Sequence, residues 1–263
     1  MKIMPSAACF MLFFAMAGAA QTPKDSRTYQ KEATVSEAKG IVHIVANSPR
    51  PLDQVLDALR LKYGWAVGYE DPRYTAAQDL TEGTSGNAAG VKFPSGGNFS
   101  AEFSANAPDE EKILRQIVDT YNHSKNPGQF EVRPSAGKQF SIAGVAAHDD
   151  KGAMTPQTPP LDVQVTLPSE ERSLTATLDL LCQEISKQSH IDVAVAVTPR
   201  SLLSKTTTKL GGKAQARELL IQIIAATTHK LYWQVIYDPN SKAYLLNLHS
   251  LRAAEPAEAK PAH

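Results

Sequence analysis

The chain has 263 residues, with 27 basic and 27 acidic side chains and therefore no formal net charge. This balance argues against nucleic-acid binding, which needs a concentrated positive field. Residues 1–20 combine one lysine, an apolar run and a closing set of small residues, the pattern of a cleavable secretory signal peptide. We therefore expect a periplasmic or secreted protein that starts near Gln21. No other segment approaches the roughly 20 apolar residues that span a membrane.

The two cysteines have different expected fates. Cleavage would remove Cys9. A lipid-modified Cys9 is the alternative, although the apolar run follows this cysteine instead of preceding it. Cys182 would then be the single cysteine of the mature chain, which leaves no intramolecular disulfide. It lies beside Leu181 on an apolar helix face, where we expect a small buried hydrophobic residue.

The first elements follow from apolar spacing. Residues 21–40 are polar and lack periodicity, so we expect a flexible lead-in there. Residues 41–45 are β-branched and predict the first strand. Residues 52–71 join a helix with one apolar stripe directly to an alternating strand. Pro51 suits the first turn of that helix, and Gly64 suits its left-handed end.

The next stretch alternates between glycine-rich and periodic segments. Residues 75–97 are rich in glycine and small polar residues and predict a long mobile loop. Residues 98–103 alternate as a strand does, and a helix begins near 108–111, where acidic residues meet the positive end of the helix dipole. Two apolar runs, 130–132 and 140–142, flank a Pro-Ser-Ala-Gly hairpin signal.

The same order of elements then returns. Residues 149–160 are charged and then proline-rich, which indicates an interdomain linker. Three leucines of the first helix recur at one constant offset: Leu52, Leu56 and Leu59 match Leu174, Leu178 and Leu181. Five positions of the second helix recur without gaps: Ile113, Leu114, Ile117, Val118 and His123 match Leu219, Leu220, Ile223, Ile224 and His229.

The repeat sets the predicted fold. We expect an α+β protein of two tandem βαββαββ-type sandwiches, each with two helices packed against small sheets. The predicted domains are residues 41–148 and 161–250. Residues 251–263 form an Ala/Pro/Glu-rich tail with nothing to bury, so we expect it to be disordered.

The stretch PLDQVLDALRLKYGWAVGYEDP, residues 51–72, resembles the start of the secretin and TonB short N-terminal (STN) domain. The family pattern runs P-L-x-x-A-L-x-x-L, then a glycine, an alternating strand, and Asp or Pro. Residues 98–121 and 206–228 resemble the second half of that pattern. The family alanine is Val55 in the first repeat and Thr177 in the second. The resemblance implies two helices held between a small and a larger sheet.

The resemblance also implies a function. STN-like domains are periplasmic protein–protein interaction modules at the front of secretin pores and signalling outer-membrane receptors. The implied partner is therefore another envelope protein, of the secretin, outer-membrane receptor or anti-sigma type.

Catalytic signatures are missing from the sequence. There is no G-x-S-x-G elbow, H-E-x-x-H, Walker loop or G-x-G-x-x-G. The pairs Ser36/Lys39 and Ser135/Lys138 fit the S-x-x-K pattern of penicillin-recognising enzymes, but the supporting S-D-N and K-T-G elements are absent. We therefore predict no catalytic, cofactor-binding or metal residues, no cofactor and no enzyme activity.

Two further groups of side chains have both a structural and a functional interpretation. His123 and His229 fall near the ends of the two second helices, where helix capping or exposure is favoured over metal ligation. Core packing is favoured over a ligand platform for four aromatic residues of the closing hairpin. They are Tyr232, Trp233, Tyr237 and Tyr244.

The sequence thus predicts a non-enzymatic interaction module for an envelope secretion or receptor/signalling system. We expect strand 243–248 to be an open sheet edge that a partner strand could join. The alternative is a cell-envelope hydrolase or a cell-wall or carbohydrate-binding protein. Such a protein would use the glycine-rich segment 75–97 and the aromatic hairpin as its cleft.

Overall fold

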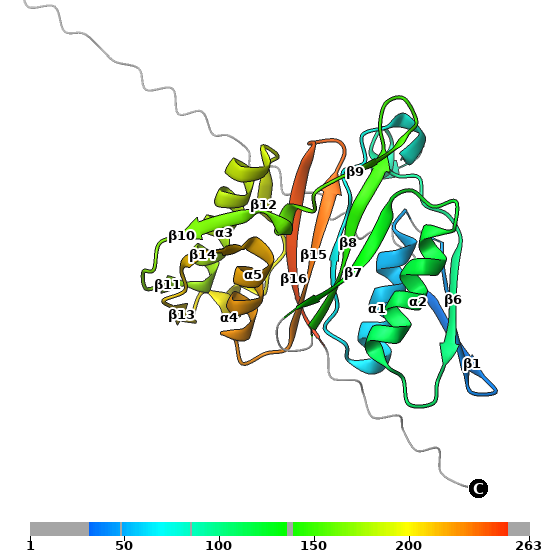
Figure 1. Cartoon of the computed structure of the whole chain (residues 1–263), viewed down its shortest axis with the longest axis horizontal. Helices are drawn as coiled ribbons and strands as arrows, with labels where there is room; N and C mark the ends of the chain where they lie inside the picture. The colour runs from blue at the N-terminus through cyan, green and yellow to red at the C-terminus, as the bar shows by residue number, and fades with distance from the viewer. Residues whose placement is uncertain (1–31, 48, 85, 136–138, 252–263) are drawn as a thin grey trace, which may run out of the picture. The chain divides into compact units, whose positions relative to one another are not determined.

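The structure is a computed structural model that describes residues 32–251, except 48, 85 and 136–138 (Figure 1). The predicted signal peptide, the predicted mature start at Gln21 and residues 252–263 of the predicted tail lie outside the described residues. Within the described part of the chain, no helix is long and apolar enough to cross a membrane.

The fold is α+β, as predicted, and its main elements fall into two halves. The first half contains β1 (Thr34–Ala38), β2 (Ile41–Ala46), α1 (Pro51–Tyr63), β3 (Gly68–Glu70), β6 (Phe99–Ser104), α2 (Glu110–Asn122), β7 (Gln129–Ser135) and β8 (Gln139–His148). The second half contains β10 (Gln164–Leu167), α3 (Leu174–Ser189), β12 (Val193–Val195), β14 (Gly212–Gln215), α5 (Ala216–Ala225), β15 (Leu231–Asp238) and β16 (Ala243–Ser250).

Both halves pair their strands in the same way. β2, ahead of α1, pairs antiparallel with β6, ahead of α2, and β10, ahead of α3, pairs in the same way with β14, ahead of α5. The strand after the first helix pairs in parallel with the last strand, as β3–β8 and as β12–β16. The closing hairpins are β7–β8 and β15–β16. The recurring apolar spacing of the sequence therefore corresponds to recurring topology.

Local sequence explains where the helices begin and end. Pro51 occupies the first turn of α1, and Gly64 ends it in the left-handed region with φ 66°. The same left-handed ending occurs after α3 at His190, with φ 56°. Asp109 caps α2, because its carboxylate accepts the backbone N–H of Lys112 at 3.0 Å.

The two halves share one sheet of seven strands. Its order is β12-β16-β15-β3-β8-β7, with β9 (Met154–Pro156) pairing the end of β8. β15 of the second half pairs in parallel with β3 of the first half, so that Gln234 lies opposite Tyr69 and Val235 opposite Glu70. The segment expected to be a semi-extended linker thus contributes a strand, and the halves join edge to edge.

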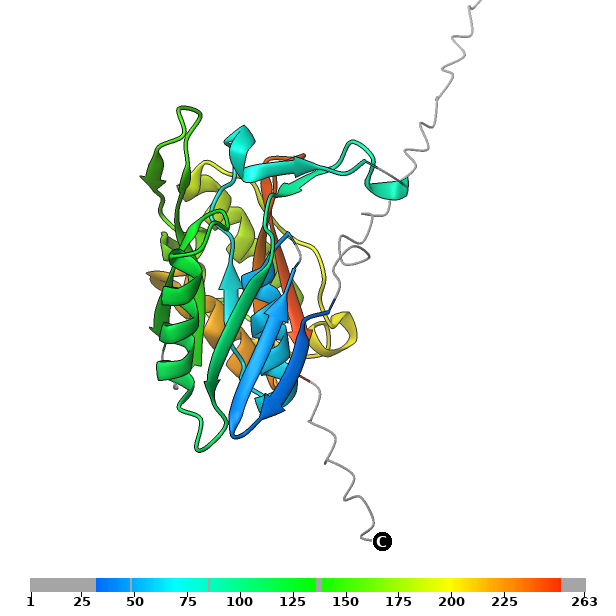
Figure 2. The ribbon, with the colours of Figure 1, turned by 90° about the vertical axis from the view of Figure 1, so that its right-hand side faces the viewer.

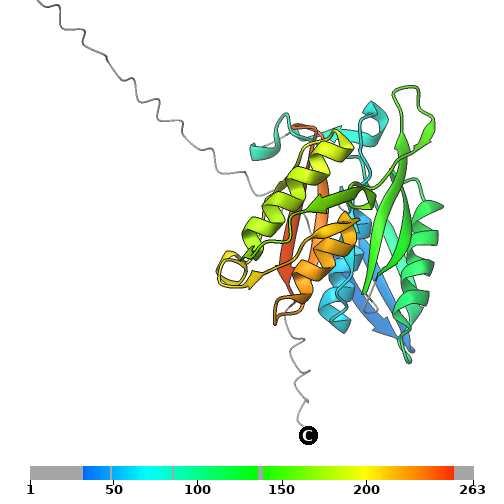
Figure 3. The ribbon, with the colours of Figure 1, turned by 60° about the vertical axis from the view of Figure 1, so that its left-hand side comes forward.

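Each half has its own core on its own face of this sheet. Tyr69 packs with α1 and α2 in the first core, whereas Val235 packs with α3 and α5 in the second. Because Val235 lies opposite Glu70, the residue after Tyr69, these two cores lie on opposite sides of the shared sheet. Figure 3 shows α3 and α5 in front of β15 and β16.

Two segments expected to be flexible form strands. Residues 34–38 of the predicted lead-in form β1, which pairs antiparallel with β2. Figure 2 shows β1, β2 and β6 side by side as a three-stranded sheet. Residues 75–97 contain two short 3₁₀ turns and a hairpin of β4 (Leu80–Glu82) with β5 (Lys92–Pro94). In both places backbone pairing forms without the apolar alternation that signals a strand in sequence.

The remaining short elements lie in the second half. They are the 3₁₀ turn at Pro160–Asp162, β11 (Arg172–Ser173), α4 (Arg200–Leu203) and β13 (Thr207–Thr208). β10 begins at Gln164, after the turn that residues 160–162 form.

The prediction of an open edge at residues 243–248 is wrong. β16 lies inside the sheet, with β15 on one side and β12 on the other. Leu246, for example, pairs with both Val235 and Val195. The sequence placed this strand last in the chain, but chain order does not set the order of strands in a sheet.

Candidate functional site

The structure describes three of the four residues that matched the S-x-x-K pattern: Ser36, Lys39 and Ser135. Ser36 is exposed on β1, and Lys138 lies outside the described residues. Among the residues that the structure describes, no group of three or more His, Cys, Asp or Glu side chains is arranged to hold a metal ion.

The two histidines at equivalent helix ends are both exposed. The His123 ring nitrogen Nδ1 lies 2.8 Å from the carbonyl oxygen of Asp119 and 3.5 Å from its carboxylate. His123 is therefore placed to cap the end of α2, in agreement with the capping interpretation.

Cys182 is buried in the core of the second half, as predicted. Burial raises the pKa of its thiol to about 12. The thiol is therefore protonated at neutral pH, and a buried thiol of this kind is a poor nucleophile.

The aromatic hairpin forms core rather than a ligand platform. Trp233, Tyr237 and Tyr244 are almost completely buried, and the rings of Tyr237 and Tyr244 pack edge to face at 5.1 Å. Only Tyr232 is partly exposed. Three of the four aromatic side chains are thus unable to contact a sugar or peptide at the surface.

The glycine-rich segment is held to its surroundings. Asp79 accepts the backbone N–H of His148 at 3.0 Å, and its carboxylate lies 2.7 Å from the imidazole nitrogen Nδ1. Asn240, in the turn between β15 and β16, exchanges two hydrogen bonds with the backbone of Lys92. The segment therefore connects the two halves.

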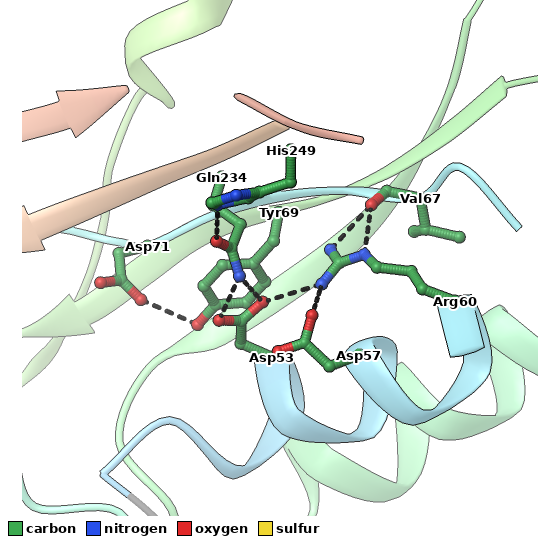
Figure 4. A network of polar contacts seen from close by, with 8 residues as sticks. All are labelled: Asp53, Asp57, Arg60, Val67, Tyr69, Asp71, Gln234 and His249. Atoms are coloured by element: carbon green, nitrogen blue, oxygen red, sulfur yellow. Dashed lines mark hydrogen bonds and ion pairs between the residues drawn. The ribbon is translucent and has the colours of Figure 1, made fainter. Parts of the chain in front are cut away.

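The densest group of buried polar side chains lies where β3 meets β15, a region that we call the seam (Figure 4). Asp53 of α1 accepts two hydrogen bonds from the amide of Gln234 on β15, at 2.8 and 2.9 Å. The Gln234 carbonyl oxygen lies 2.9 Å from His249 Nε2. One carboxylate of the first half is thus held by side chains of the second half.

Arg60 anchors the same group from the helix side. Its guanidinium donates to Asp57 at 2.6 Å, to Asp53 at 3.3 Å and twice to the carbonyl oxygen of Val67. The guanidinium also lies 4.2 Å from the ring centre of Tyr232, within cation–π range. Arg60 therefore fixes the end of α1 against both the following strand and the second half.

Asp71 forms the second polar centre of the seam. Its carboxylate accepts from Arg50 at 2.6 Å, from the Tyr69 hydroxyl at 2.8 Å and from the backbone N–H of Tyr237 at 3.0 Å. Arg50 also donates to the carbonyl oxygen of Tyr237 at 2.8 Å. This carboxylate extends the strand pairing beyond β3 by accepting a backbone donor of β15.

A third centre lies on the opposite face of the sheet. Arg217 of α5 pairs with Glu70 and donates to Ser141 at 2.9 Å and to Asp162 at 2.6 Å. Glu70 is fully buried, and within the described part of the chain its charge is balanced by Arg217 and by the nearby N–H of Leu161. The two faces of the joint are thus both closed by charged groups.

Burial sets the electrostatics of the seam. Burial raises the pKa of the Asp53 carboxyl to about 7, and the nearby Asp57 adds to the rise while Arg60 and Gln234 oppose it. Burial also raises the pKa values of Glu70 and Asp71, against the effect of their arginine partners. These side chains form their hydrogen bonds and ion pairs with each other. The network therefore aligns the two halves.

The hollows on the surface of the described residues include the following two. One of about 680 Å³ lies beside the three-stranded sheet and is lined by residues including Ile41, His43 and Glu102. The other, of about 330 Å³, lies between the end of β7 and α5 and is lined by residues including Ser135 and Arg217. Arg217, which lines this hollow, is already engaged by Glu70 and Asp162.

The sequence interpretation missed the polar seam. Asp53 and Arg60 lie on a helix whose sequence pattern is amphipathic, and charged residues of such a helix are expected to face water. One signal was available: the constant offset between the first helices aligns Arg60 with Cys182, which was itself expected to be buried.

No protein-family model, curated protein or solved structure matches this chain. The resemblance to STN domains therefore stays a prediction.

Proposed function

We propose that this protein is a non-enzymatic interaction module of the cell envelope, exported by a cleavable signal peptide and mature from near Gln21. Its partner would be another envelope protein, of the secretin, outer-membrane receptor or anti-sigma type. The proposed contact surface is the β1 edge together with the outer face of the β1-β2-β6 sheet, which we call the small-sheet face.

The observation that carries this proposal is the exposure of aliphatic side chains on the outer face of the small sheet, next to its β1 edge. Ile41 and Val45 of β2 are 37% and 49% exposed. Side chains alternate along a strand, and Val42 and Ile44, which lie between these two residues, point into the core. Val35 of β1, which pairs with the inward-facing Ile44, lies on the other face of the sheet and is 40% exposed at its edge. Exposed aliphatic side chains on a solvent-facing sheet are typical of interaction sites.

The backbone of β1 adds a second means of recognition. All five residues of β1 are exposed, and no described strand pairs with its outer side. An extended peptide could therefore continue the sheet, using backbone hydrogen bonds for affinity and the neighbouring side chains for specificity. His43 and Glu102, paired at 3.0 Å on the same face, would supply polar contacts at the rim.

The test is capture of partners from envelope extract with Ile41→Asp and Val45→Asp variants. Each substitution places a charge in the proposed interface, and we expect binding to weaken by about tenfold or more. Val91→Asp is the matched control, since Val91 is also 39% exposed but lies before β5. Bound partner should slow hydrogen exchange in β1.

Two results would contradict the proposal. Equal losses for the Val91 and Val45 variants would show that the added charge acts non-specifically. Turnover of a cell-wall or ester substrate, abolished by one polar substitution, would favour the enzyme alternative. Intact-mass measurement of exported protein tests the predicted start at Gln21.

A further inference from the structure

The joint between the halves provides a template for a contact between molecules. Within the chain, the last-hairpin strand β15 of the second half lies in parallel beside β3, the first strand of the seven-stranded sheet in the first half. The equivalent strands of the opposite halves are β7 and β12. These two strands form the two ends of the sheet order, and no described strand covers their outer sides (Figure 1).

The strand registers define which residues are equivalent. In the first half, Ile142 lies opposite both Tyr69 and Val132. In the second half, Leu246 lies opposite both Val195 and Val235. Val195 is therefore the counterpart of Tyr69, and Val132 is the counterpart of Val235. One residue earlier, Glu131 of β7 is the counterpart of Gln234.

The β12 end carries buried polar atoms at the positions that hold β15 at the seam. Thr175 is the counterpart of Asp53, and Arg172 is the counterpart of Arg50, each at the same distance from the matched leucines of the two helices. Thr175 Oγ1 and Arg172 Nε are buried and have no hydrogen-bond partner among the described residues, although Arg172 donates through Nη2 to the carbonyl oxygens of Pro168 and Leu210. On the β7 end, Arg133 Nε also has no partner among the described residues, while Arg133 Nη2 lies 3.2 Å from the Glu131 carboxylate and 3.5 Å from that of Asp162. Buried polar atoms of this kind cost stability until a partner satisfies them.

The seam also contains one hydrogen bond between a backbone donor and a carboxylate, and the two sheet ends lack both of these groups at the equivalent positions. At the seam, the backbone N–H of Tyr237 donates to Asp71. The counterpart of Tyr237 is Pro134, which has no N–H, and the counterpart of Asp71 is Val197, which has no acceptor and is 41% exposed. Joining these ends would therefore leave neither a donor nor a carboxylate unpaired at that place.

We propose that a second copy of this chain docks its β7 edge onto β12, in parallel, with Glu131 opposite Val195. The joint repeats the seam, with the Thr175 hydroxyl placed to donate to the Glu131 carboxylate where Gln234 donates to Asp53. Because the two surfaces differ, each copy keeps one edge free after pairing. The contact is heterologous, and copies add head to tail.

The orientation of the β12 backbone supports this docking. The N–H of Ala196 donates to Leu246 O within the sheet at 2.9 Å. Since successive residues of a strand point their backbone groups to opposite sides, the N–H of Val195 faces outward. Proline at position 195 removes this outward donor and leaves the bond of Ala196 in place.

The test mixes two single-cysteine variants of the full chain, Glu131→Cys and Val195→Cys, under mild oxidation. We expect disulfide-linked heterodimers from the mixture. Ser100→Cys mixed with Val195→Cys is the control, because Ser100 is exposed on β6 and away from either proposed edge. The native Cys182 is buried and stays unreactive. Cross-linking no greater than in the control mixture would overturn the proposal.

Sedimentation over a range of protein concentrations provides an independent measurement. The parent chain should show a weight-average mass that rises with concentration. Val195→Thr should behave like the parent, whereas Val195→Pro should associate at least tenfold more weakly with an unchanged circular dichroism spectrum. A parent that stays monomeric at every concentration, or a folded proline variant that associates as well as the parent, would refute the head-to-tail contact.

Discussion

Replacing Asp53 with asparagine should change how the stability of this protein depends on pH. Asparagine keeps the size of the side chain and an oxygen acceptor for Gln234, but it cannot ionise. Burial raises the pKa of Asp53 from 3.8 to about 7. The folded state therefore binds this proton more tightly than the unfolded state does. The stability that protonated Asp53 contributes is full below pH 3.8 and is lost as pH rises through about 7.

The magnitude follows from the difference between the two pKa values. Each pKa unit corresponds to about 1.4 kcal/mol, so the complete effect is about 4 kcal/mol. Between pH 5 and pH 8 the parent should lose about 3 kcal/mol through this group. The free energy of unfolding of Asp53→Asn, relative to that of the parent, should therefore rise by about this amount over the same interval.

Urea unfolding of the parent and the variant at four pH values from 5 to 8 measures this difference. Glu70 and Asp71 also have raised pKa values and affect both proteins, so the comparison isolates Asp53. Asp57→Asn is a second comparison: Asp57 is 39% exposed and adds to the raised pKa of Asp53, so removing its charge should move the parent's loss of stability to lower pH without abolishing it. A parallel pair of curves for the parent and Asp53→Asn would refute the reasoning.

Two further predictions concern packing. A Cβ atom added at Gly68 would lie 2.3 Å from the fully buried ring of Trp233, so Gly68→Ala should lower the free energy of unfolding by roughly 1–3 kcal/mol. Gly97→Ala, whose Cβ would meet its nearest neighbour at 4.0 Å, should be neutral in the same urea titration. The Cys182 thiol should react slowly with a thiol reagent in native protein at pH 8 and rapidly in urea, since burial raises its pKa to about 12. Fast native labelling would place Cys182 at the surface.

The proposed binding surface and the proposed head-to-tail contact use different edges. The small-sheet face involves β1 and β2, whereas the head-to-tail contact involves β7 and β12. A partner could therefore bind the Val45 region of each copy in a chain of copies. Val45→Asp should leave self-association unchanged, and Val195→Pro should leave the binding of a single partner unchanged.

The sequence by itself determined the local elements. The apolar stripe of α1, its proline start and the left-handed turn at Gly64 depend on neighbouring residues and on φ preferences, so they can be read along the chain. The same holds for the burial of Cys182, because its helix face carries Leu178 and Ile185. The recurrence of apolar spacing likewise anticipated that both halves pair their strands in one pattern.

Only the tertiary structure decided which strands meet. Backbone pairing is available to any extended segment, so spacing could not show that β16 is interior, that β1 forms a strand, or that β15 joins β3. That last pairing in turn buries Asp53, which a helix pattern places in water. Asp53 is buried because a distant segment supplies its partner, Gln234. The residues near Asp53 in sequence do not indicate which segment will pack there.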